Sequence, residues 1–180
     1  QRVQVSYPAI DSSAYVDLDT ADTDRRLADR GLVRDGYVMF LSRLSKAKGV
    51  DDLINGFAVS AARTRTKLVI CGNGPEGLEL RALAASTPDP EQIVFFDDVD
   101  DAEKPHLLAG SSAYVLASKP RPEFVETFGI ALAEKMLAGG GPIITCATGG
   151  IPEAVGPHAR IVPPGHPNAI ANALAEVILG

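Results

Sequence analysis

Six apolar segments of strand length alternate with six segments of helical pattern along most of this chain. The strand-length segments cover residues 37–42, 67–71, 92–96, 112–117, 142–146 and 159–162. The helical segments cover residues 50–63, 76–86, 102–109, 128–138, 151–155 and 167–179. In such a series each helix carries the chain back to the start of the next strand, which makes the strands parallel. The alternation therefore predicts an α/β fold with one parallel sheet.

The apolar patterns indicate that helices cover this sheet on both faces. Val38–Leu41 and Leu68–Cys71 are continuously apolar, as strands buried between two helical layers should be. The segment that begins at Val50 carries apolar residues at spacings of three and four, which form one stripe that packs on a sheet. We therefore expect a doubly wound, Rossmann-like sheet within residues 37–180.

The first 36 residues have a different pattern. They carry Ser, Asp and Pro around an isolated apolar Val3-Gln-Val5 and a charged, helix-like stretch near Asp22–Arg30. We interpret residues 1–36 as an entering strand and a connecting segment. A chain of 180 residues with 46% hydrophobic content can bury one good core, so we expect a single folded domain.

Composition excludes several classes of partner. The net charge is −6 and no basic run is present, which argues against nucleic-acid binding. No apolar stretch approaches the ~20 residues that a membrane helix requires, and the first residues do not resemble a signal peptide. We expect a soluble, cytoplasmic protein without a membrane span. Cys71 and Cys146 end apolar strands and are expected to be buried thiols.

Two cations follow the first predicted strand. Arg43 and Lys48 lie in the loop that leaves segment 37–42, and in α/β sheets ligands bind beyond the carboxyl ends of the strands. A guanidinium and an ammonium at one loop suit a diphosphate. The alternative is a solvated surface pair.

Two glutamates, Glu126 and Glu134, are separated by seven residues around a predicted helix start. Phe128, Gly129 and Ile130 would present free backbone amides there, which is a natural anion site. If the helix starts near Phe128, Glu134 lies ~10 Å farther along its axis. The two carboxylates could then hold opposite ends of an extended ligand. The alternative makes Glu126 a helix cap and Glu134 a solvated position.

These segments together carry a family resemblance. They are Ser42-Arg-Leu-Ser-Lys-Ala-Lys48-Gly, Val69-Ile-Cys-Gly-Asn-Gly-Pro75, Glu126-Thr-Phe-Gly-Ile with Glu134, and Thr148-Gly-Gly-Ile-Pro-Glu153. In this order they resemble the C-terminal, donor-binding half of retaining glycosyltransferases with the GT-B fold, glycosyltransferase family 4. Thr127 departs from this pattern, because glycine is common at its position.

The resemblance implies a role for each candidate residue. Arg43 and Lys48 would neutralise a nucleoside diphosphate, Glu134 would bind the ribose hydroxyls, and Glu126 would hold hydroxyls of the sugar. Amides near Phe128, Gly129 and Ile130 would complete the cradle, and Gly72 and Gly74 are expected beside the nucleotide. The implied reaction moves a sugar from a nucleoside diphosphate sugar to a sugar or lipid-linked acceptor, with no cofactor and no metal.

The same resemblance implies that this chain lacks an N-terminal, acceptor-binding domain. We therefore expect the isolated chain to bind the sugar donor and to transfer sugar poorly. A noncatalytic nucleotide-sugar-binding module is a second interpretation that the sequence leaves open.

A rival motif is Gly72-Asn-Gly-Pro-Glu-Gly77, which satisfies the dinucleotide-binding pattern G-x-G-x-x-G and suggests an NAD-dependent oxidoreductase. Against it, another βα unit precedes this one, whereas the dinucleotide motif usually occupies the first turn. The acidic cluster from Asp97 to Asp101 suggests either a cation site or a solvated loop. The three histidines, His106, His158 and His166, lack metal-ligand spacing and are expected to be structural or surface residues.

Overall fold

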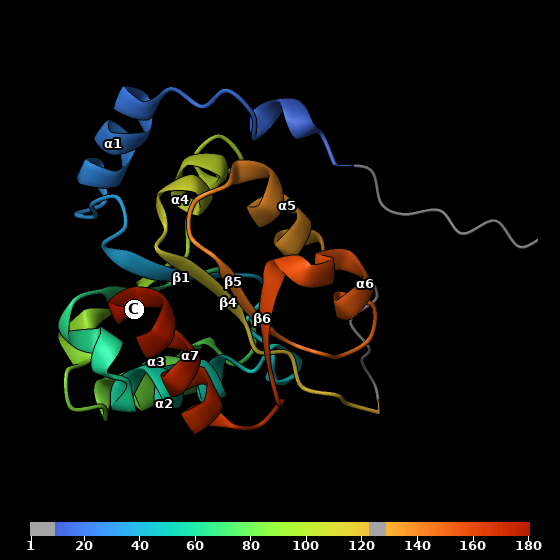
Figure 1. Cartoon of the computed structure of the whole chain (residues 1–180). Coiled ribbons are helices and arrows are strands. Elements are labelled where there is room, and N and C mark those ends of the chain that lie inside the picture. The colour runs from blue at the N-terminus through green and yellow to red at the C-terminus, as the bar shows by residue number, and fades with distance from the viewer. Residues whose placement is uncertain (1–9, 123–128) are drawn as a thin grey trace, which may run out of the picture.

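The computed structural model of the chain describes residues 10–122 and 129–180, whose strands form one six-stranded sheet (Figure 1). The strands are β1 Tyr37–Leu41, β2 Lys67–Cys71, β3 Ile93–Phe96, β4 Ala113–Leu116, β5 Ile143–Cys146 and β6 Ala159–Val162. All neighbouring strands pair in parallel, in the order β3-β2-β1-β4-β5-β6. This is the strand order of the Rossmann fold, so the predicted fold class is confirmed.

Helices cover both faces of the sheet, as an all-parallel sheet requires. They are α1 Thr20–Asp29, α2 Val50–Val59, α3 Gly77–Ala85, α4 Lys104–Gly110, α5 Ile130–Ala138, α6 Ile151–Val155 and α7 Pro167–Leu179. Figure 1 shows α2, α3 and α7 on one face and α1, α4 and α5 on the other. No helix within the described ranges is long and apolar enough to cross a membrane.

The helix predicted over residues 50–63 is divided in two. α2 ends at Val59, and a separate 3₁₀ helix covers Ala61–Thr64. Ser60 between them adopts an extended conformation, accepts the amide of Ala62 with its Oγ, and donates that hydroxyl to Ala171 O at 2.8 Å. A serine side chain that competes for backbone groups in this way ends a helix.

The central strands form the core. Val38, Met39 and Phe40 of β1 and Val69 and Ile70 of β2 have no exposed surface. The continuously apolar pattern of these strands therefore has the predicted cause, which is burial on both faces. The free thiols of Cys71 and Cys146 are buried as expected, and burial raises the pKa of Cys146 to about 11.

Helix α1 lies in the stretch that was interpreted as a connecting segment. Asp19 caps it by accepting the amide of Asp22, and Leu27 is fully buried in the main core together with Tyr15 and Leu32. The helix-like stretch near Asp22–Arg30 is thus a helix, but its packing on the core through Leu27 was not expected from its charged sequence. Val3-Gln-Val5 lies outside the described residues.

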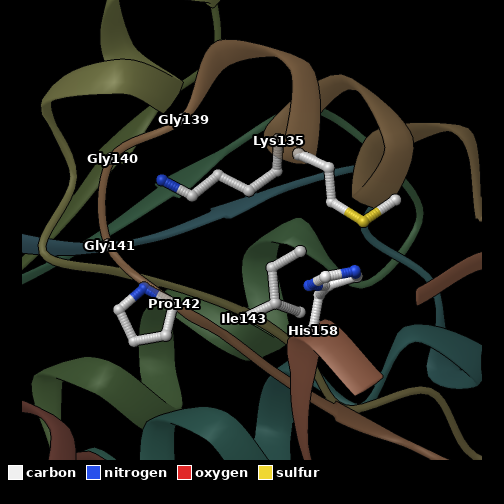
Figure 2. Close-up of a pocket in the computed structure, with 8 residues that line it drawn as sticks. Lys135, Gly139, Gly140, Gly141, Pro142, Ile143 and His158 are labelled. Atoms are coloured by element: carbon white, nitrogen blue, oxygen red, sulfur yellow. The ribbon is translucent and has the colours of Figure 1, made fainter. Parts of the chain in front are cut away.

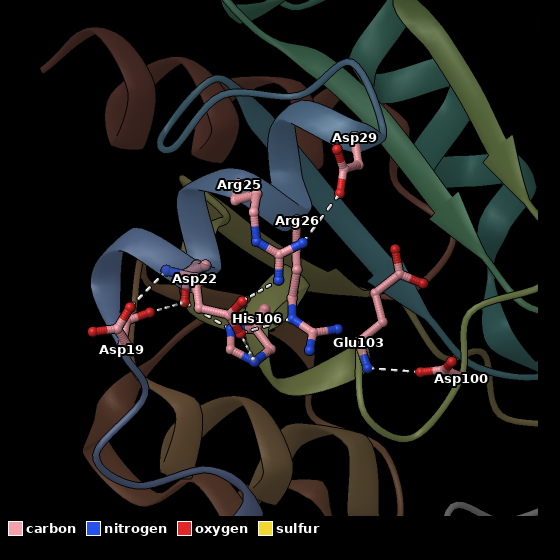
Figure 3. A network of polar contacts seen from close by, with 9 residues as sticks. Asp19, Asp22, Arg25, Arg26, Asp29, Asp100, Glu103 and His106 are labelled. Carbon is pink, nitrogen blue, oxygen red and sulfur yellow. Dashed lines mark hydrogen bonds and ion pairs between the residues drawn. The ribbon is translucent and has the colours of Figure 1, made fainter.

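Polar contacts hold α1 against α4 (Figure 3). The carboxylate of Asp22 pairs with Arg25 and Arg26 on its own helix and lies 3.6 Å from His106 Nε2 on α4. His106 Nδ1 bonds the hydroxyl of Thr23 at 2.7 Å, and this hydroxyl also donates to Asp19 O. His106 is thus a structural residue, as expected, and burial lowers its pKa.

The turn between β1 and α2 depends on one glycine. Gly49 has φ +65°, and a Cβ atom placed on it would lie 1.9 Å from Ala117 O at the end of β4. The backbones of two neighbouring loops therefore approach to a distance that no side chain permits. Gly31, after α1, has nearly the same φ of +68° but open space around it.

We predict that Gly49→Ala destabilises the fold much more than Gly31→Ala. Both changes place alanine in the left-handed region, which costs ~1 kcal/mol. Gly49→Ala also forces two backbones apart and should cost more than ~3 kcal/mol. Urea unfolding of both variants, followed by circular dichroism, measures the difference. Equal losses would show that the β1–α2 turn does not depend on this close approach.

Candidate functional site

The strand order places a topological switch point at the carboxyl ends of β1 and β4. These strands are neighbours, but the helix after β1 covers one face of the sheet and the helix after β4 covers the other (Figure 1). The loops therefore diverge at this point, which is where open α/β sheets bind ligands. Arg43 and Lys48 lie in the loop after β1, and Gly129 and Ile130 lie at the start of α5 after β4.

The loop after β1 is attached to the exit of β4. The amide of Lys119 donates to Ala47 O at 2.8 Å, and its ammonium pairs with Asp51 at 2.7 Å and Asp52 at 3.0 Å. Burial alone would lower the pKa of Lys119, but the two carboxylates raise it. Arg43 is exposed on this loop and Lys48 is half-buried. The sequence prediction therefore placed both cations correctly at this edge.

The N-terminus of α5 has the form of an anion site. Gly129 precedes the helix with φ +68°, and no described side chain caps the first turn. Uncapped amides at a helix N-terminus carry the positive end of the helix dipole. Ile130 begins the helix and is 46% exposed, so this end opens to solvent. Glu126 and Phe128 lie outside the described residues.

Glu134 lies on α5 and is not a solvated surface residue. Its Oε1 accepts the hydroxyl of Tyr15 at 2.7 Å and the ammonium of Lys104 at 2.9 Å, and its side chain is 13% exposed. The alternative of a solvated glutamate is therefore wrong. Tyr15 and Lys104 were not among the sequence candidates. They come from residues 10–19 and from the first turn of α4, and no local pattern pointed to either of them.

Packing against the loop after β1 requires glycine at positions 72 and 74. A Cβ atom on Gly72 would lie 2.1 Å from Ser42 O, and one on Gly74 would lie 2.2 Å from Leu44 O. The loop after β2 therefore rests against the loop after β1, with Leu44 exchanging backbone bonds with its neighbours there. This packing accounts for the first two glycines of the G-x-G-x-x-G motif without a dinucleotide, whereas a Cβ atom on Gly77 would make only an ordinary contact of 3.8 Å with Leu44. Contact of these glycines with a nucleotide stays a prediction.

The acidic loop after β3 is tied to arginines. Arg30 binds Glu103 through two nitrogens at 2.6 and 2.7 Å and Asp98 at 2.8 Å. Arg81 binds Asp97 at 2.6 Å, and Asp100 accepts the amide of Glu103 (Figure 3). Within the described part of the chain, no group of three or more metal-ligating side chains is present. The loop is thus organised by ion pairs, which the two interpretations from sequence did not include.

The family model for glycosyl transferases group 1 matches residues 27–180. The chain belongs to this family. Among curated relatives, N-acetyl-alpha-D-glucosaminyl L-malate synthase of Bacillus anthracis is 29% identical over 85% of this chain and 38% of its own length. D-inositol 3-phosphate glycosyltransferase of Corynebacterium glutamicum (strain R) is 30% identical over 98% of this chain and 43% of its own length. The chain thus spans less than half the length of these two glycosyltransferases.

Solved structures show the same fold. HepE of Anabaena in complex with UDP has a TM-score of 0.84 at 24% identity, covering 98% of this chain and 48% of HepE. The C-terminal domain of LpcC, a glycosyl transferase group 1 family protein of Francisella tularensis, has a TM-score of 0.75 at 21% identity. It covers 96% of this chain and 89% of that domain. These likenesses confirm the Rossmann-like fold of this glycosyltransferase domain.

A cavity of about 470 Å³ lies at the opposite edge of the sheet in this glycosyltransferase domain (Figure 2). Lys135 lines it and extends along the turn at Gly139–Gly141, at the amino end of β5. Its ammonium donates to Leu108 O at 2.6 Å and to Ser111 Oγ at 2.9 Å, at the C-terminal end of α4. Burial lowers the pKa of Lys135 to about 8. This lysine caps a helix and belongs to the scaffold.

We predict that Arg30→Met destabilises the domain by ~1–2 kcal/mol and increases amide exchange in residues 97–103. Arg30 is only 23% exposed, pairs bidentately with Glu103, and lies 5.0 Å from the centre of the Phe96 ring. The control is Arg25→Met, since Arg25 is 61% exposed and its ion pairs with described residues, Asp22 and Asp29, lie along its own helix. Urea unfolding and hydrogen exchange measure both effects. An unchanged exchange rate in Arg30→Met would mean that the loop is ordered without this arginine.

Proposed function

We propose that this chain is the C-terminal, donor-binding domain of a retaining glycosyltransferase of family 4. Such an enzyme moves a sugar from a nucleoside diphosphate sugar to an acceptor. The observation that carries the proposal is that the cationic loop after β1 and the N-terminus of α5, which no described side chain caps, lie at the switch point of a Rossmann-like sheet. HepE, which has the same fold, is described in complex with UDP and with UDP-glucose, and the matching part of LpcC is its C-terminal domain.

In this proposal, Arg43 and Lys48 stabilise the diphosphate leaving group. As the bond between sugar and phosphate breaks, negative charge grows on the diphosphate leaving group. Cations and helix amides already placed at that position lower the barrier, because they need no reorganisation during the reaction. The amides at Gly129 and Ile130 add the dipole of α5 to the two side-chain charges. This arrangement accounts for charge stabilisation with protein groups alone.

Glu134 is assigned to the ribose of the sugar donor. Its carboxylate lies on the fifth residue of α5, one turn and a fraction beyond the proposed phosphate position. A carboxylate accepts two hydroxyl donors, so the vicinal hydroxyls of ribose are a matched ligand. Glu126 is assigned to the hydroxyls of the transferred sugar, on the strength of the sequence resemblance.

The complete protein is proposed to hold its acceptor on a second domain. The chain spans 38% of the Bacillus anthracis relative and 47% of HepE, so more than half of each of those proteins lies outside the matched part. With one wall of the cleft, the domain should bind the nucleotide but leave its sugar open to water. We therefore expect binding without efficient transfer. A noncatalytic binding module would bind equally well, and restored transfer on addition of the second domain separates the two.

The proposal predicts saturable binding of one nucleoside diphosphate to the purified chain. Calorimetric titration with UDP, GDP, ADP, TDP and NAD identifies the base. The double change Arg43→Ala, Lys48→Ala should weaken binding by ~10-fold or more, because both charges face the diphosphate. Lys46→Ala is the matched control and should leave the affinity unchanged. Lys46 is exposed and shares the short 3₁₀ helix Lys46–Lys48 with Lys48.

Two outcomes would contradict this assignment. Binding of NAD alone would restore the oxidoreductase interpretation of the glycine motif. Absence of diphosphate binding by a chain with a native circular dichroism spectrum would remove the donor site from this edge of the sheet.

A further inference from the structure

Among the described residues, the carboxylate of Glu134 is hydrogen-bonded through one oxygen only. Both recorded hydrogen bonds, from Tyr15 and from Lys104, end on Oε1. Within the described residues, no hydrogen bond is recorded on Oε2. A carboxylate oxygen has two lone pairs, so Oε2 retains its full capacity to accept hydroxyl groups.

The two groups on Oε1 are built to hold it. Tyr15 is 6% exposed, and burial together with the Glu134 carboxylate raises its pKa to about 12, so the phenol remains a proton donor. Burial lowers the pKa of Lys104, but the bond to Glu134 outweighs this effect and the net direction is upward. Asp101, the other carboxylate near Lys104, lies 3.5 Å away and is fully exposed. The ammonium is therefore committed chiefly to Glu134.

The three side chains come from distant parts of the chain. Tyr15 precedes α1, Lys104 begins α4, and Glu134 lies on α5, at a sequence separation of 119 from the tyrosine. Tyr15 also belongs to the main hydrophobic core, so its hydroxyl is fixed by the packing of its ring. A free glutamate would lose rotamer freedom on binding a ligand, whereas this one is already ordered.

We propose that Tyr15 and Lys104 are positioning residues for the nucleotide site, which hold Glu134 by Oε1 so that Oε2 accepts ribose hydroxyls. The inference rests on the proposed function, because it assumes that Glu134 receives the ribose. It adds two residues outside the recognised motifs. It also makes the segment before α1 part of the machinery that selects a ribonucleotide.

The test is the preference for ribose over 2′-deoxyribose. UDP, GDP and ADP are titrated against the purified chain alongside their 2′-deoxy counterparts, and the ratio of the two dissociation constants is taken for each pair that binds. The wild-type chain should prefer the ribonucleotide by ~10-fold. Glu134→Gln should bring the ratio close to one. Tyr15→Phe and Lys104→Met should reduce it to ~3-fold or less, since each removes one of the two bonds on Oε1.

Matched variants separate positioning from stability. Tyr15→Phe keeps the ring and Lys104→Met keeps the aliphatic stem, so both variants should retain the fold. Lys104→Arg should restore most of the preference, because it returns a cation to Oε1. Asp101→Asn, which removes the exposed carboxylate near Lys104, should leave the ratio at its wild-type value. Replacement of a residue that merely stabilises the fold would lower the melting temperature without changing the ratio of the two dissociation constants.

The outcomes distinguish this inference from the function on which it rests. If the wild-type chain binds none of the diphosphates, or binds the ribo and deoxyribo forms equally, the assignment of Glu134 to the ribose fails. If Glu134→Gln abolishes the preference while Tyr15→Phe and Lys104→Met keep it, the donor site stands and the positioning role is overturned.

Discussion

The pairing of β1 with β2 on one side and β4 on the other is the constraint on which the rest of this domain depends. It places β1, whose first four residues are fully buried, at the centre of the sheet, and the helices that follow β1 and β4 diverge to opposite faces. This divergence makes the carboxyl ends of β1 and β4 a topological switch point, which is where open α/β sheets bind their ligands. The cationic loop and the N-terminus of α5 both lie at this switch point because of the strand order.

Close backbone approach then shapes the edge of the sheet. Gly49 meets the end of β4, while Gly72 and Gly74 meet the loop after β1, each at a distance that excludes a side chain. The loops after β1, β2 and β4 are therefore held together by backbone contacts. The first two glycines of a motif that resembles a dinucleotide fingerprint are explained here by packing between loops. Its glycines show that one local pattern can have two physical causes.

Charge at this edge is divided between scaffold and site. Arg30 and Arg81 bind the acidic loop after β3, and Lys119 binds the first turn of α2. These ion pairs orient loops, and the charges of the three cations are neutralised by neighbouring carboxylates. Glu134 stands between the two classes, since one of its oxygens is held by the scaffold and the other has no recorded partner among the described residues. In this glycosyltransferase domain, Glu134 is therefore a candidate for ligand binding because one of its oxygens has no hydrogen bond to a described residue.

The sequence by itself determined the parallel sheet, most helix positions and the placement of Arg43, Lys48 and Gly129 at one edge, because apolar periodicity and βα alternation are local signals. It did not reveal the packing of α1, whose charged surface carries one buried leucine, or the partners of Glu134. Only the tertiary structure decided these features. Tyr15 and Glu134 meet across 119 positions, and a contact of that range depends on how complete elements pack rather than on any pattern near either residue.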